Sequence, residues 1–155
     1  MSGCIIPVAP DFQDPLGSPN YAPELFSANP PFGSVTPLTA PVGGGFSFLA
    51  IDRNVTDSLF VNWVVDEYMT PSLIQNDQAA PSVNGTLQPH MFSVQVSCYR
   101  LPSMTTASIH TLEAIVADGD FVPGTLDKTQ ESDRKITRGD WFFTLTCSSG
   151  ATTPP

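Results

Sequence analysis

Charged residues, and basic ones above all, are scarce in this chain of 155 residues. Six lysines and arginines stand against fifteen aspartates and glutamates, so the formal net charge is −9, and charged residues make up only 14% of the sequence. Negative charge repels a phosphate backbone, and the sequence contains no basic stripe that would bind one. These features exclude nucleic acid from the expected partners.

Long apolar runs and common catalytic motifs are also missing. No run approaches the roughly 20 apolar residues that span a bilayer, so we expect attachment to a membrane only through a covalent lipid or a partner. The sequence has no Gly-x-Ser-x-Gly, no His-Glu-x-x-His and no phosphate-binding glycine loop, and it has only two histidines, His90 and His110. We therefore expect neither enzymatic activity nor a cofactor. One alternative stays open, because a Ser, His and Asp triad is defined by geometry and not by sequence order.

Turn-forming residues, in contrast, are abundant: the chain has 11 glycines and 16 prolines. Between them lie short apolar runs, several with the two-residue alternation of a half-buried strand. Strands are expected at residues 24–27, 46–51, 59–66, 92–99, 110–117 and 140–147, with a short edge strand near 72–75. Short strands separated by turns, without an amphipathic helix, are typical of a sandwich or barrel. The expected fold is all-β, an immunoglobulin-like antiparallel β-sandwich.

The distribution of proline divides the chain into three parts. Residues 1–20 alternate prolines with small and acidic residues, a pattern that favours an extended proline-rich N-terminal tether. Residues 21–147 contain every expected strand and form the sandwich domain. Residues 148–155 are expected to be a disordered polar tail.

Aromatic residues fall on both faces of the expected strands. Trp63 and Trp141 lie on the apolar faces and are most simply core residues. Phe60, Tyr99 and Phe142 lie on the opposite faces and, if they gather on one sheet, form an apolar patch for a protein partner. The alternative is that the proline-rich N-terminal segment covers them.

Acidic and amide side chains follow two of the strands. Asp52, Asn54 and Asp57 occupy one turn, and Asp118 and Asp120 occupy another, which should lie at the same end of a sandwich. Their oxygens could hold Ca²⁺, which takes six to eight oxygen ligands. Asp and Asn are also ordinary turn residues, so a purely structural role is the competing interpretation.

The segment Ser2-Gly3-Cys4 resembles the end of a bacterial lipobox, with Met1 where that family usually has Leu. The resemblance implies that Cys4 accepts the lipid and anchors the protein to a membrane. Ile5 after the cysteine, by the sorting rule of that family, implies the outer membrane. The alternative is an ordinary cytosolic start with a free cysteine.

Three cysteines leave one unpaired unless one has another use. A lipid on Cys4 leaves Cys98 and Cys147, whose strands should end at the same pole, to form a disulfide in an oxidising compartment. The alternative is two buried free thiols that pack as small apolar groups.

A second resemblance covers residues 46–147. Ile51-Asp52, Phe60-Val61-Asn62-Trp63 and Val116-Ala117-Asp118-Gly119 resemble motifs of the polycystic-kidney-disease-like and cadherin-like modules of bacterial surface proteins. This resemblance implies a surface module with an immunoglobulin-like sandwich. It departs from antibody domains, because no cysteine pair joins the second and sixth strands.

Together these observations predict a non-catalytic envelope lipoprotein that acts as an interaction or structural module. Its expected partners are the membrane, through Cys4, and another envelope protein. Two other classes stay open: a calcium- or carbohydrate-binding adhesion module, and a soluble structural component of a phage or particle.

Overall fold

The computed structural model describes residues 19–40, 42–66, 72–81, 85–101, 108–130 and 134–147. In these residues the chain forms eight β-strands, and we find no helix long and apolar enough to cross a membrane. Cys4, the tether up to residue 18 and the expected tail lie outside the described residues. The expectations for these parts therefore stay predictions.

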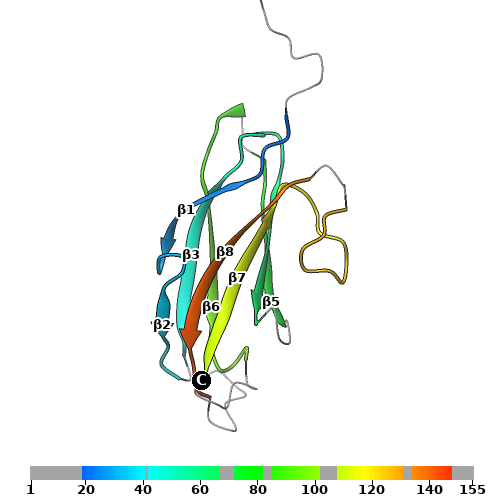
Figure 1. Cartoon of the computed structure of the whole chain (residues 1–155). Helices are drawn as coiled ribbons and strands as arrows, with labels where there is room; N and C mark the ends of the chain where they lie inside the picture. The colour runs from blue at the N-terminus through cyan, green and yellow to red at the C-terminus, as the bar shows by residue number, and fades with distance from the viewer. Residues whose placement is uncertain are drawn as a thin grey trace, which may run out of the picture.

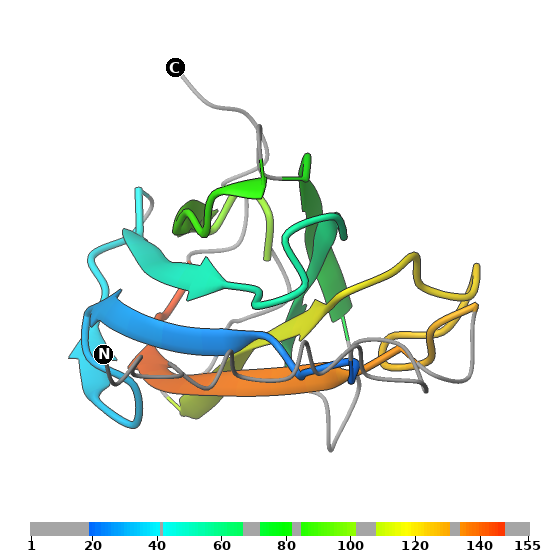
Figure 2. The ribbon, with the colours of Figure 1, turned by 90° about the horizontal axis from the view of Figure 1, so that it is seen from above.

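Two sheets make up the domain. The first sheet has three antiparallel strands in the order β1 (Glu24–Asn29), β3 (Gly44–Ile51) and β6 (His90–Val96). The second has the order β2 (Val35–Pro37), β8 (Ile136–Thr144), β7 (Ile109–Ala117), β4 (Leu59–Val65) and β5 (Ser72–Ala79). In the second sheet β2 runs parallel to β8, and the other neighbours are antiparallel (Figure 1). Seen from above, β3 of the first sheet lies across from β7 and β8 of the second (Figure 2).

This arrangement confirms the expected immunoglobulin-like β-sandwich. The chain leaves β1 in the three-stranded sheet and crosses at once to β2 in the five-stranded sheet. The first two strands therefore belong to different layers. Successive strands β3 and β4, and likewise β6 and β7, also lie in different sheets, as in a Greek-key sandwich.

Two strands differ most from the expectation. The bounds of others are also shifted, since β6 covers His90–Val96 in place of 92–99 and β8 covers Ile136–Thr144 in place of 140–147. Strand β2 was not expected, because Val35–Pro37 is three residues long and has no alternation, and it is held by its parallel pairing with β8. Strand β5 continues to Ala79, well beyond the short strand expected near 72–75. The sequence did not indicate the full length of β5, because an edge strand buries little surface and can therefore be polar.

The core consists of large apolar side chains from both layers. The largest fully buried members include Phe46 and Phe48 of β3, Trp63 of β4, and Trp141 and Phe143 of β8. The expectation that both tryptophans are core residues is confirmed: each is 0% exposed. These rings form one connected aromatic layer between the two sheets.

Both buried indoles have hydrogen-bond acceptors. Trp141 Nε1 donates to the carbonyl of Pro30 at 2.6 Å, and Trp63 Nε1 donates to Asp77 Oδ2 at 2.9 Å. An unpaired buried N–H would cost about 1–3 kcal/mol, so these bonds permit complete burial. They also attach the β1–β2 connection and edge strand β5 to the core.

Strand β4 is buried on both faces, which corrects the expectation of a half-buried strand. Asn62 and Val64 point away from the core yet are only 3% and 0% exposed. Asn62 Nδ2 donates to the carbonyl of Leu126 at 3.0 Å, so the long connection between β7 and β8 is attached to this outer face. Glu113 of β7 is likewise 3% exposed and forms an ion pair with Arg138 at 2.7 Å.

Cys98 and Cys147 form a disulfide in the structure, with their Cα atoms 5.5 Å apart. Cys98 follows β6 and Cys147 follows β8, so the bridge joins the two sheets at the pole where these strands end. We call this end the disulfide pole.

The triple glycine before β3 has a steric function. Gly43 has φ of +74°, and a Cβ built there would lie 1.7 Å from the carbonyl oxygen of Val96. Gly43 is required because the chain entering β3 passes too close to the end of β6 for any side chain.

Replacing Ala114 with Leu should lower the free energy of unfolding by at least about 2 kcal/mol, because overpacking forces the rings off their rotamers. Ala114 lies on β7 between the strands that carry Trp63 and Trp141, whose rings stack with centroids 5.8 Å apart. Urea unfolding followed by tryptophan fluorescence measures the effect. The control is Ala80→Leu, at an exposed position, which should change stability by less than about 0.5 kcal/mol. Equal effects in the two variants would contradict this account.

Replacing both Cys98 and Cys147 with Ala should lower the free energy of unfolding by about 4 kcal/mol, because the bridge closes a loop of 49 residues. Chemical denaturation of the double variant tests this magnitude. Peptide mapping without reductant should find the two cysteines linked. Alkylation of both Cys98 and Cys147 in the folded, unreduced protein would contradict the bridge.

Candidate functional site

The turn from β3 to β4 places two carboxylates at the pole opposite the disulfide. Asp52 directly follows β3, and its Oδ1 accepts the backbone N–H of Asn54 at 2.8 Å, the hydrogen bond of an Asx turn. The N–H of Asp57 then donates to the carbonyl of Asn54 at 2.8 Å, which closes a second turn. The sequence of this loop thus determines its local conformation.

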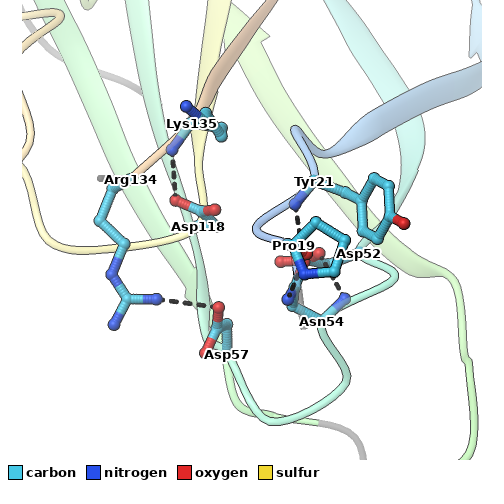
Figure 3. Close-up of polar contacts among 8 residues, drawn as sticks. All are labelled: Pro19, Tyr21, Asp52, Asn54, Asp57, Asp118, Arg134 and Lys135. Atoms are coloured by element: carbon cyan, nitrogen blue, oxygen red, sulfur yellow. Dashed lines mark hydrogen bonds and ion pairs between the residues drawn. The ribbon is translucent and has the colours of Figure 1, made fainter. Parts of the chain in front are cut away.

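Asn54 is directed toward the N-terminal segment and away from these carboxylates. Its Oδ1 accepts the N–H of Tyr21 at 2.9 Å, and its Nδ2 donates to the carbonyl of Pro19 at 3.4 Å (Figure 3). The structure therefore does not place Asn54 among the candidate metal ligands. Instead, its side chain binds the segment through which the chain enters the domain.

Asp118 reaches the same pole from the end of β7. Its side chain is buried, with 1% of the residue exposed, and its Oδ1 accepts the N–H of Lys135 at 2.7 Å. The N–H of Asp118 in turn donates to the carbonyl of Lys135, so the long connection begins and ends at this contact. Asp120 is exposed and lies outside the cluster, although it lines an adjacent cavity.

Three of the five predicted ligands converge. Asp52, Asp57 and Asp118 each place one carboxylate oxygen within 4.8 Å of the others (Figure 3). We call this end of the sandwich the acidic pole. Arg134 lies beside it and pairs with Asp57 Oδ2 at 2.8 Å. A cavity of about 260 Å³, lined in part by Asp57, Asp118 and Arg134, adjoins the cluster.

Burial makes ionisation at the acidic pole costly. It is the main cause that raises the pKa of Asp52 from 3.8 to about 6, and the charges of Asp118 and Asp57 act in the same direction. The N–H of Asn54 and the charge of Arg134 oppose the shift. Burial also raises the pKa of Asp118. The hydrogen bonds and the positive charge near the acidic pole therefore do not fully offset the cost of ionising its carboxylates.

The expected aromatic patch does not assemble. Phe60 and Phe142 are half-buried on the outer face of the five-stranded sheet, but they pair with Ala117 and Thr111, at opposite ends of β7. Six residues of strand separate these rows, about 20 Å. Tyr99 lies in the turn after β6, which belongs to the other sheet.

Apolar side chains instead form a row on the outer face of the three-stranded sheet. Phe26, Leu49 and Met91 are register partners across β1, β3 and β6. Phe26 is 38% exposed and Met91 is 75% exposed. Sequence reasoning missed this row because Leu49 sits in a continuous apolar run, and register alone places it beside the other two.

Folding also brings together a serine, a histidine and an aspartate. Ser108 Oγ lies 2.9 Å from His110 Nε2, and His110 Nδ1 lies 2.7 Å from Asp66 Oδ2. These are the contacts of a hydrolase triad, which sequence order could not reveal. Acyl transfer also needs a substrate cleft and oxyanion donors, and none of these three residues lines the cavity at the acidic pole. Asp66 has a structural role as well, because its Oδ1 accepts the N–H of Thr111 at 2.9 Å.

Comparisons with protein-family models, with curated proteins and with solved structures give no match for this chain.

An Asp52→Asn variant, measured in EDTA, should be more stable than the parent above pH 6. The folded-state pKa of Asp52, about 6, exceeds its ordinary value of 3.8, so rising pH removes stability between these values. At about 1.4 kcal/mol per pKa unit, the penalty above pH 6 is at most about 3 kcal/mol. Because an amide does not ionise, the gain should shrink as pH falls from 6 and vanish below 3.8.

Urea unfolding at pH 3.5, 5 and 7 tests this dependence. The matched control is Asp57→Asn, which removes the ion pair with Arg134 and should not stabilise the protein. A loss of stability in Asp52→Asn at pH 7 would contradict the interpretation that burial disfavours this charge.

Proposed function

We propose that the protein is a non-catalytic lipoprotein of a bacterial envelope, in which Cys4 carries the lipid and the sandwich acts as an interaction or structural module. The observation that carries this proposal is the disulfide between Cys98 and Cys147. Disulfides persist in oxidising compartments outside the cytosol. The bridge therefore supports export of the protein.

The same bridge singles out the remaining cysteine. The chain has three cysteines, and two of them are paired, which leaves Cys4 within Ser2-Gly3-Cys4. An odd cysteine in an exported protein needs a separate explanation. Acylation supplies one, and it agrees with the resemblance to the lipobox.

The fold suits a module that works by contact. Pro19 and Tyr21 are held at the acidic pole by Asn54, so the chain enters the domain there. The apolar row of Phe26, Leu49 and Met91 lies along one sheet face between the poles, where another envelope protein could contact it.

Metabolic labelling with a fatty-acid analogue tests the anchor. The parent, expressed from its native gene in its own host, should take up the label and fractionate with membranes. A Cys4→Ala variant should lose both properties. The control, Ser2→Ala, preserves a small residue before Gly3-Cys4 and should keep the label.

A parent protein without label, recovered in the soluble fraction, would overturn the proposal. A label that survives in Cys4→Ala would also overturn it, because the lipid would then reside elsewhere. Recovery of the unlabelled chain within an assembled particle would favour the alternative of a soluble structural component.

A further inference from the structure

We propose that Asp52, Asp57 and Asp118 bind a hard divalent cation, Ca²⁺, at the acidic pole. The three carboxylates come from two separate turns, and one oxygen of each lies within 4.8 Å of the others. This proposal concerns the pole alone and does not depend on the lipid anchor.

Two buried oxygens at this cluster point independently to a ligand. Among the described residues, Asp52 Oδ2 and Asp118 Oδ2 are buried without a hydrogen-bond partner, and the two residues are only 6% and 1% exposed. Their Oδ1 atoms accept the N–H groups of Asn54 and Lys135, and the side chain of Asn20 adds a hydrogen bond to the carboxylate of Asp118. A buried carboxylate oxygen without a partner is costly, and a bound cation would remove that cost.

The charge at the pole also fits a divalent ion. When all three carboxylates are ionised, Arg134 compensates one charge and leaves two negative charges. The raised pKa values of Asp52 and Asp118 agree with this deficit. A divalent cation neutralises the remainder without requiring protonation.

The chemistry of the ligands selects the kind of cation. Carboxylate oxygens suit Ca²⁺ and Mg²⁺, whereas zinc and copper sites in proteins favour histidine and cysteine. Ca²⁺ takes six to eight oxygens in flexible geometry, and the cavity beside Asp57 and Asp118 has room for water ligands. Ca²⁺ is therefore the ion to test first.

Thermal unfolding with and without CaCl₂ tests the site, with NaCl at equal ionic strength as the reference. For a dissociation constant of about 0.1–1 mM, 10 mM Ca²⁺ should raise the midpoint of the parent by about 3–10 °C. Asp52→Asn and Asp118→Asn should lose this rise. The control Asp140→Asn, at an exposed position on β8, should keep it.

A second test is Arg134→Gln, which should strengthen Ca²⁺ binding where the aspartate variants weaken it. This change removes the cation that competes for Asp57 and keeps the methylene stem that packs near Gly119. Calorimetric titration should therefore show Ca²⁺ binding about tenfold tighter than in the parent. A residue with a purely structural role would not strengthen binding when replaced.

Hydrogen exchange locates the effect. Ca²⁺ should slow exchange of the Asn54 and Lys135 amides, which donate to Asp52 and Asp118, and should leave the strand amides near Cys98 unchanged. Two results would overturn the proposal: no Ca²⁺ response beyond that of NaCl, or an undiminished response in both Asp52→Asn and Asp118→Asn. Circular dichroism confirms that each variant is folded before titration.

Discussion

The stacking of Trp63 and Trp141 is the contact on which the rest of the domain depends. The two indoles come from β4 and β8, the strands on either side of β7, and their ring centroids lie 5.8 Å apart. Phe46 and Phe48 of the facing sheet pack against these rings. An aromatic layer thus holds the sheets together where an antibody domain has a disulfide between its second and sixth strands.

The two poles of the sandwich, which lie beyond the aromatic core, differ in their chemistry. Strands β6 and β8 end at one pole, where a covalent bridge joins the sheets. At the other pole, β3 and β7 deliver Asp52 and Asp118 into a buried cluster that destabilises the ionised protein. Each of these carboxylates accepts a backbone N–H that shapes its loop, and the cation proposed for this pole would also offset the cost of burying them.

Much of the fold could be predicted because alternation along a strand reports burial directly. The alternating faces of β4, β6 and β7 indicated the core, and turn residues marked the ends of the strands. Strand β2 and the second half of β5 could not be found in this way, since an edge strand buries little surface and needs no apolar face. Nor could the burial of Asn62 and Glu113 be foreseen, because it depends on a distant connection that returns to the sheet.

The candidate site could likewise be predicted only in part from the sequence. By itself the sequence determined that acidic residues would occupy the turns after β3 and β7, and that both turns would lie at one end of a sandwich. Only the tertiary structure decided which of the five converge: it buried Asp52 and Asp118, turned Asn54 toward the entering chain and left Asp120 exposed. The reason is physical. Local sequence sets the direction of a turn, whereas the burial of a carboxylate and its distance from another depend on how two separate loops pack together.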